Sequence, residues 1–126
     1  MASMSDYVLD AALSKLDTEA DKIYITSQEA TTYTEATSTY ALGVATTISI
    51  GAPQDRTASG GGREVVLSNV TGGNVTATGD ADTFALVDST NSRLLATGGL
   101  TGGGQTVTSG NTFILASITL GIPDPA

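Results

Sequence analysis

Short runs of alternating apolar and polar residues occupy most of this chain, and many of the apolar positions are β-branched. Such runs predict strands. Clusters of Gly, Asn and Asp separate the runs at intervals of about eight to twelve residues, a spacing typical of antiparallel sandwiches and barrels. The runs are Lys22–Thr26, Leu42–Ile50, Glu64–Val70, Val75–Thr78, Thr83–Val87, Arg93–Thr97, Gln105–Thr108 and Thr112–Leu120.

Helical periodicity is absent between these strands, which argues against a parallel sheet built from βαβ units. The predicted fold is therefore all-β, with an antiparallel β-sandwich or barrel-like body. The Thr-rich segment Ser27–Tyr40 and the glycine-containing segment Gly51–Gly62 are expected to be loops. Thr71–Asn74 and Ser109–Asn111 are expected to be turns, since Gly and Asn favour them.

The first residues follow a different pattern that favours a short helix. Ser5 or Asp6 can act as its N-cap, because a side-chain oxygen there accepts an unpaired backbone N–H. A helix this short is marginal alone, so it must pack on the body or on a neighbour. The alternative is an extended arm that orders only on assembly. The expected apolar stripe consists of Tyr7, Val8, Ala11, Ala12 and Leu16.

The chain of 126 residues is expected to form one folding unit with two zones. Residues 1–40 hold the N-terminal helix or arm and the first strand, and are acidic and Thr-rich. Residues 41–126 form the β body.

Composition then restricts the function. The chain contains no His, Cys or Trp. Histidine is the usual general base near neutral pH, and His and Cys are the main ligands of zinc and of many transition metals. We therefore expect a protein that is not an enzyme and that carries no cofactor.

Charge restricts the partners. The net charge is −8, and the five basic residues are scattered, whereas nucleic-acid binding needs clustered Lys and Arg. No apolar stretch is long enough to span a bilayer. We expect neither nucleic acid nor membrane as a partner, but a protein with a basic or neutral surface.

Two groups of carboxylates are candidates for a metal-binding site. Asp17, Glu19 and Asp21 have the spacing that begins a calcium loop, but Lys22 and Gln28 stand where such a loop needs Gly and Glu. Asp80 and Asp82 form only a short pair. Both groups are interpreted as solvated turns, and no metal site is predicted.

Three stretches of the chain resemble small virion proteins of tailed bacteriophages that infect alphaproteobacteria. The stretches are Tyr7–Tyr40, Asp88–Gly98 and Gly110–Ala126. The resemblance implies a structural component of the virion, similar to the decoration (cement) proteins of phage heads. Such proteins bind the major capsid protein on the outer surface of the head, often as trimers, and brace the shell.

The expected function is therefore capsid decoration by a homo-oligomer, with a trimer favoured. A head-fibre, collar or tail component is one alternative, and a small carbohydrate- or calcium-binding β module is another. We expect Ser5–Tyr40 to make the main contact with the shell or a neighbouring subunit. The candidate interface residues are Tyr7, Leu9, Leu13, Tyr24, Tyr33 and Tyr40.

Overall fold

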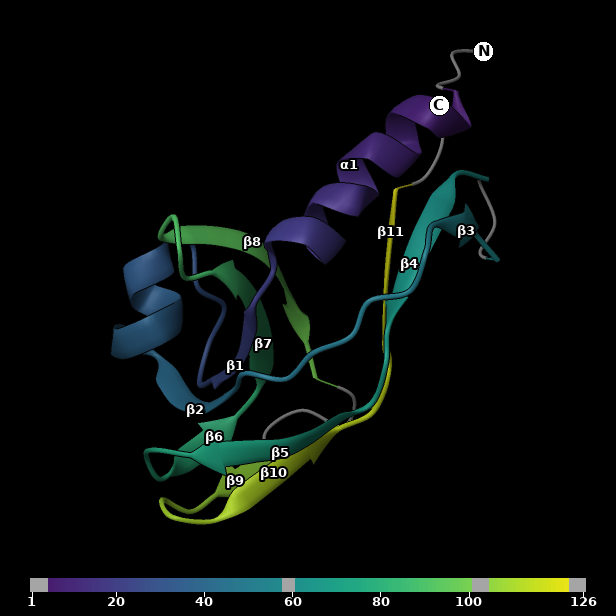
Figure 1. The fold of residues 1–126 in the computed structure, drawn as a ribbon. Coiled ribbons are helices and arrows are strands. Elements are labelled where there is room, and N and C mark those ends of the chain that lie inside the picture. Colours follow the sequence, from purple (N-terminus) through teal and green to yellow (C-terminus); the bar gives the residue numbers. More distant parts are fainter. Residues whose placement is uncertain (1–4, 58–60, 101–104, 123–126) are drawn as a thin grey trace.

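The computed structural model describes residues 5–57, 61–100 and 105–122 and consists mainly of antiparallel strands (Figure 1). This confirms the predicted all-β fold with a short N-terminal helix. The helical elements are α1 (Asp6–Glu19) and the π-helical turn η1 (Glu35–Thr39). The strands are β1 (Lys22–Thr26), β2 (Ala41–Ala45), β3 (Gln54–Asp55), β4 (Arg63–Leu67), β5 (Val70–Val75), β6 (Gly79–Ala81), β7 (Thr83–Asp88), β8 (Arg93–Gly99), β9 (Gln105–Val107), β10 (Thr112–Leu115) and β11 (Ile118–Ile122).

The largest sheet has six strands in the order β10-β5-β2-β1-β7-β8. A second sheet has the order β11-β4-β3, and β6 pairs with β9. Strand β1 lies in the middle of the large sheet, where Tyr24 pairs with Val44 of β2 and with Ala85 of β7. The N-terminal zone thus supplies a central strand of the body.

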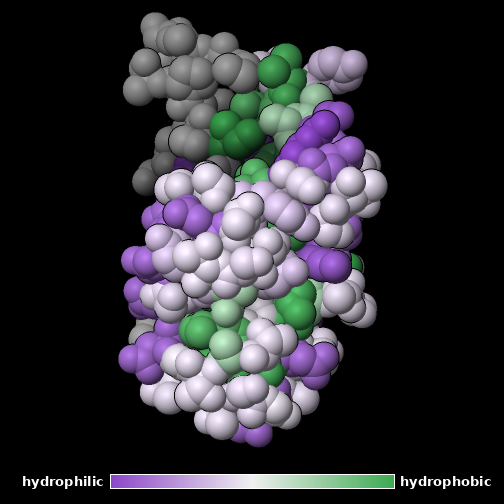
Figure 2. Space-filling model, turned by 90° about the vertical axis from the view of Figure 1, so that its left-hand side faces the viewer, coloured by the Kyte–Doolittle hydropathy of each residue, from purple (hydrophilic) through white to green (hydrophobic). Residues whose placement is uncertain are grey.

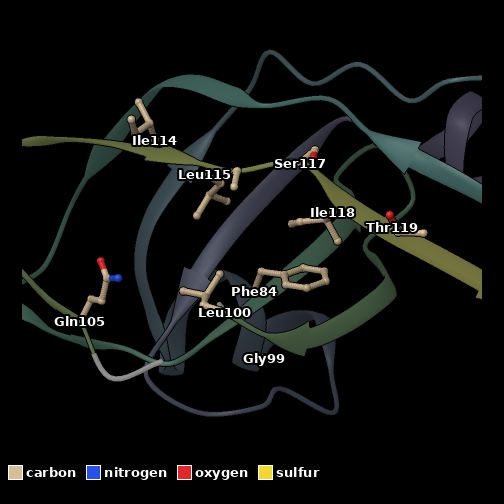
Figure 3. Close-up of a pocket in the computed structure, with 10 residues that line it drawn as sticks. Phe84, Gly99, Leu100, Gln105, Ile114, Leu115, Ser117, Ile118 and Thr119 are labelled. Carbon is tan, nitrogen blue, oxygen red and sulfur yellow. The ribbon is translucent and has the colours of Figure 1, made fainter. Parts of the chain in front are cut away.

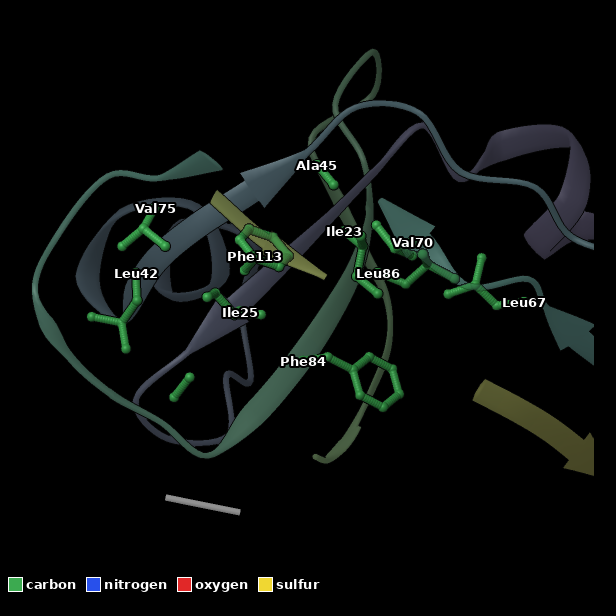
Figure 4. Packing of buried hydrophobic residues seen from close by; sticks show 11 residues of the cluster. Ile23, Ile25, Leu42, Ala45, Leu67, Val70, Val75, Phe84, Leu86 and Phe113 are labelled. Carbon is green, nitrogen blue, oxygen red and sulfur yellow. The ribbon is translucent and has the colours of Figure 1, made fainter. Parts of the chain in front are cut away.

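The main hydrophobic core lies on one face of the six-stranded sheet (Figure 4). It is mostly aliphatic, because the chain has few aromatic residues, and Phe84 and Phe113 are its two rings. Burying such side chains is the main force that holds a β body of this kind together. The cluster contains Ile23, Ile25, Leu42, Ala45, Leu67, Val70, Val75, Ala81, Phe84, Leu86 and Phe113.

The opposite face of the sheet is covered by the segment that follows β1. The expected loop Ser27–Tyr40 contains η1, and its Ala30 and Ala36 pack against Ala85 and Val87 of β7. Strand β7 is therefore buried on both faces, which explains its continuous run of apolar residues.

A long two-stranded ribbon connects the two larger sheets. Leu67 of β4 pairs with Ile118 of β11, and Val70 of β5 pairs with Leu115 of β10. The same register therefore continues across Ser68–Asn69 and Ala116–Ser117, where the strands are interrupted. Figure 1 shows β4 and β11 extending from the body, with α1 alongside.

The predicted turn at Thr71–Asn74 is wrong, because these residues lie inside β5. Gly73 faces the ring of Phe113, and a Cβ atom at this position would overlap that ring. This glycine is required for close packing rather than for a change of chain direction. The expected strand Leu42–Ile50 ends at Ala45, and Ile50 makes only an isolated bridge to Leu67.

Helix α1 buries a different face from the one that the sequence pattern predicted. Ser5 is its N-cap and accepts a hydrogen bond from the Val8 amide. Leu9 and Leu13 are each 2% exposed, whereas Tyr7 is 84% exposed and Val8 49%. Of the predicted stripe, Leu16 packs against the main core, whereas Tyr7, Val8, Ala11 and Ala12 are exposed.

Candidate interaction surfaces

Most charged side chains outside the core hold parts of the fold together. The clearest case is Arg63 of β4, whose Nε donates to Asp10 Oδ1 at 2.8 Å and whose Nη1 donates to Asp55 Oδ1 at 2.6 Å. Hydrogen bonds to Asp10 and Asp55 raise the pKa of Arg63. The guanidinium thus joins α1, β3 and β4, and its rigid fork suits two carboxylates at once.

Asp21 fixes the turn between β7 and β8. Its carboxylate accepts hydrogen bonds from the Ser89 amide at 2.9 Å and the Ser89 hydroxyl at 2.6 Å. Burial opposes ionisation, but the hydrogen bonds from Ser89 and the nearby charge of Lys22 together lower the pKa of Asp21. Asp21 is therefore a structural residue rather than part of a solvated turn.

Other carboxylates are used in the same way. Buried Asp88 accepts hydrogen bonds from the amides of Thr90 and Asn91, and buried Glu64 accepts one from Gln54. Asp80 accepts a hydrogen bond from Thr106 across β6 and β9. Within the described ranges, no three acidic side chains gather closely enough to hold a metal ion.

The three tyrosines predicted for an interface come together in the structure. Tyr24, Tyr33 and Tyr40 are half-buried and pack, with Leu94, against the small cluster on the covered face of the sheet. Burial raises the pKa of Tyr24, and electrostatic repulsion from Tyr33 and Asp21 raises it further. The three rings cover this small cluster, and only part of each ring is exposed to solvent.

The other three predicted interface residues are separated from the tyrosine cluster. Leu9 and Leu13 are internal, so their side chains reach no exposed surface of the single chain. Tyr7 projects from the first turn of α1. In Figure 2 the face on the left of Figure 1 is mostly weakly polar, with small separate groups of apolar residues.

A pocket of about 410 Å³ lies where the ribbon leaves the six-stranded sheet. In Figure 3, Phe84, Leu100, Leu115 and Ile118 point toward one another, while Ile114 and Gln105 stand at the periphery. The full lining is Phe84, Gly99, Leu100, Gln105, Ile114, Leu115, Ala116, Ser117, Ile118 and Thr119, with no charged side chain.

The pattern of strands and turns in the sequence does not indicate this pocket or the exposure of Ile114, which is 74% exposed. One signal was available: residues 105–122 contain no Asp, Glu, Lys or Arg. In an acidic chain, so long an uncharged stretch could have marked an interaction surface.

No helix among the described residues has the length and apolar character needed to cross a membrane. No protein-family model, curated protein or solved structure matches this chain.

Proposed function

We propose that this chain is a non-enzymatic decoration protein that binds the major capsid protein on the outer surface of a phage head as a homo-oligomer. The resemblance of three stretches to small phage virion proteins supports the proposal, and a trimer is the oligomer that this resemblance favours. The absence of His and Cys from the sequence agrees with a binding role.

The observation that carries the proposal is the exposure of Tyr7. A tyrosine that is 84% exposed on an acidic protein is a suitable anchor for a partner, because tyrosine buries a large area at low entropic cost. Val8 lies beside it and is 49% exposed. Both belong to the segment Ser5–Tyr40, for which we propose the main contact with the shell or with a neighbouring subunit.

Weak contacts of this kind suit decoration of a lattice. A capsid offers many identical sites, and an oligomer that engages several of them gains affinity through avidity. The acidic surface also favours a partner with a basic or neutral face.

Capsid binding by variants of Tyr7 tests this proposal. Capsids that lack the protein are incubated with wild type, with Tyr7→Ser and with the control Thr90→Ala, whose exposed side chain lies between β7 and β8. We expect Tyr7→Ser to weaken binding at least about tenfold, and Thr90→Ala to bind like wild type. Equal binding by all three proteins would contradict the assignment of Tyr7.

A further inference from the structure

The long ribbon has one edge with no neighbouring strand. Strand β10 lies at the end of the six-stranded sheet and β11 at the end of the second sheet, and the two follow each other directly along the chain. Within the described residues, neither pairs with any strand beyond β5 and β4. Thr112–Ile122 therefore presents a continuous outer edge, whose backbone groups can pair with another strand.

This edge lacks the features by which proteins usually prevent edge-to-edge association. Such edges commonly carry charged residues or proline, or are very short. Strand β3 has two residues, one of which is Asp55, and β8 begins with Arg93. Between Thr112 and Ile122 there is neither a charge nor a proline, and Ile114 is 74% exposed.

An apolar hollow lies beside the same edge. The pocket is lined on the ribbon side by consecutive residues from Ile114 to Thr119, and on the body side by Phe84 and Leu100 among others. The edge thus offers both an exposed apolar side chain and an uncharged hollow that could receive one (Figure 3).

We propose that copies of this chain associate through the β10–β11 edge, with Ile114 covered in the contact. A second copy fits because an uncharged strip lets two proteins of net charge −8 meet without like charges at the contact. The edge also provides both the protruding side chain and the hollow. Ile114 of one copy can therefore enter the hollow of the next copy, which is the head-to-tail contact that closes a ring such as a trimer.

The charge of the rest of the molecule predicts how salt affects this association. Two acidic copies repel each other at long range, and salt screens that repulsion. Raising NaCl from about 20 to 500 mM should therefore strengthen the association. A contact with a basic partner would weaken under the same change.

Sedimentation velocity of the full chain, from about 1 to 100 µM, tests the proposal. We expect wild type to form oligomers, and Ile114→Lys to raise the dissociation constant at least about tenfold. Thr90→Lys is the matched control, because it changes the net charge equally at an exposed position beside β8, at the opposite end of the six-stranded sheet from β10. It should associate like wild type.

Thr119→Lys, at an exposed position of β11, is a second edge variant in case Ile114→Lys fails to fold. Far-UV circular dichroism and a urea midpoint check the fold of each protein. A monomeric wild type, an oligomer that folded edge variants leave intact, or association that weakens with salt would overturn the proposal. The inference extends the proposed homo-oligomer, but its test needs no capsid, so its failure would leave capsid binding through Tyr7 to be decided separately.

Discussion

At the residue scale, several glycines are required because nothing larger fits beside an aromatic ring. Gly43 lies so close to its neighbours that a Cβ atom would come within 2.7 Å of the Asn74 carbonyl oxygen and 2.9 Å of the Phe113 ring. Gly73 is under the same ring. These close approaches let β2 and β5 pack against the Phe113 ring.

Gly73→Ala should therefore destabilise the protein by about 1–3 kcal/mol, the usual cost of overpacking a core. The control is Gly99→Ala in β8, because a Cβ atom there would meet no other atom within 4 Å. That change should alter stability by no more than about 0.5 kcal/mol. Urea unfolding measures both, and equal effects would show that space under Phe113 is not the constraint.

Asp21 should make stability depend on pH. Its pKa in the folded protein is lowered from the usual value of 3.8, so its contribution is full above that value and is lost as pH falls through the folded pKa. Asp21→Asn removes this contribution. The gap in urea midpoint between wild type and Asp21→Asn should be constant above about pH 5 and should close as pH falls below about 4.

The difference in urea midpoint between the two proteins isolates Asp21, because the other carboxylates titrate in both proteins and their contributions cancel. A gap that stays the same down to about pH 3 would show that the bonds from Ser89 do not favour the ionised form of Asp21.

At the element scale, α1 is part of the folded body. Its leucines at positions 9 and 13 are buried, and its Asp10 binds Arg63 of β4. The same element leaves Tyr7 and Val8 exposed, so one face of the helix stabilises the fold while another is open to a partner.

Leu13→Ala should cost about 2–5 kcal/mol, because it removes a fully buried side chain and leaves a cavity. Val8→Ala, in the exposed part of the same helix, should cost about 0.5 kcal/mol or less. Thermal or urea unfolding compares the two. Similar small effects would mean that α1 does not pack on the sheet in solution.

The position of β1 decides how the N-terminal zone can be tested. A chain that begins near Ala41 lacks the strand between β2 and β7, so it should not fold. Loss of capsid binding by that truncation would then say nothing about the interface. Substitutions of exposed residues such as Tyr7 separate binding from folding.

The elements themselves could largely be predicted from the sequence, because alternation and turn residues act locally. Lys22–Thr26 and Thr83–Val87 are strands as expected, and Ser5 caps the helix. The buried face of α1 is evident in the spacing of Leu9, Leu13 and Leu16, which is that of one helix face. The partner of its Asp10 could not be predicted, since Arg63 lies 53 positions away. The role of Gly73 depends in the same way on Phe113 of another strand.

At the scale of the whole molecule, the ribbon organises the fold and the surface. It joins a curved six-stranded sheet to a smaller sheet that carries α1, and it leaves one uncharged edge beside an apolar pocket. The pocket could not be predicted from the sequence, because its walls come from β7, the end of β8 and the ribbon. The ribbon side of the pocket nevertheless belongs to residues 105–122, and the absence of charged residues from this stretch is evident in the sequence.

The central claim is that this protein decorates a capsid lattice, and its copy number in the virion tests that claim most directly. Quantitative mass spectrometry of purified virions, calibrated against the major capsid protein, gives that number. A protein that occupies the lattice should be present in on the order of hundreds of copies, as multivalent decoration requires. A handful of copies would place it at the collar or tail, and absence from the virion would contradict the account.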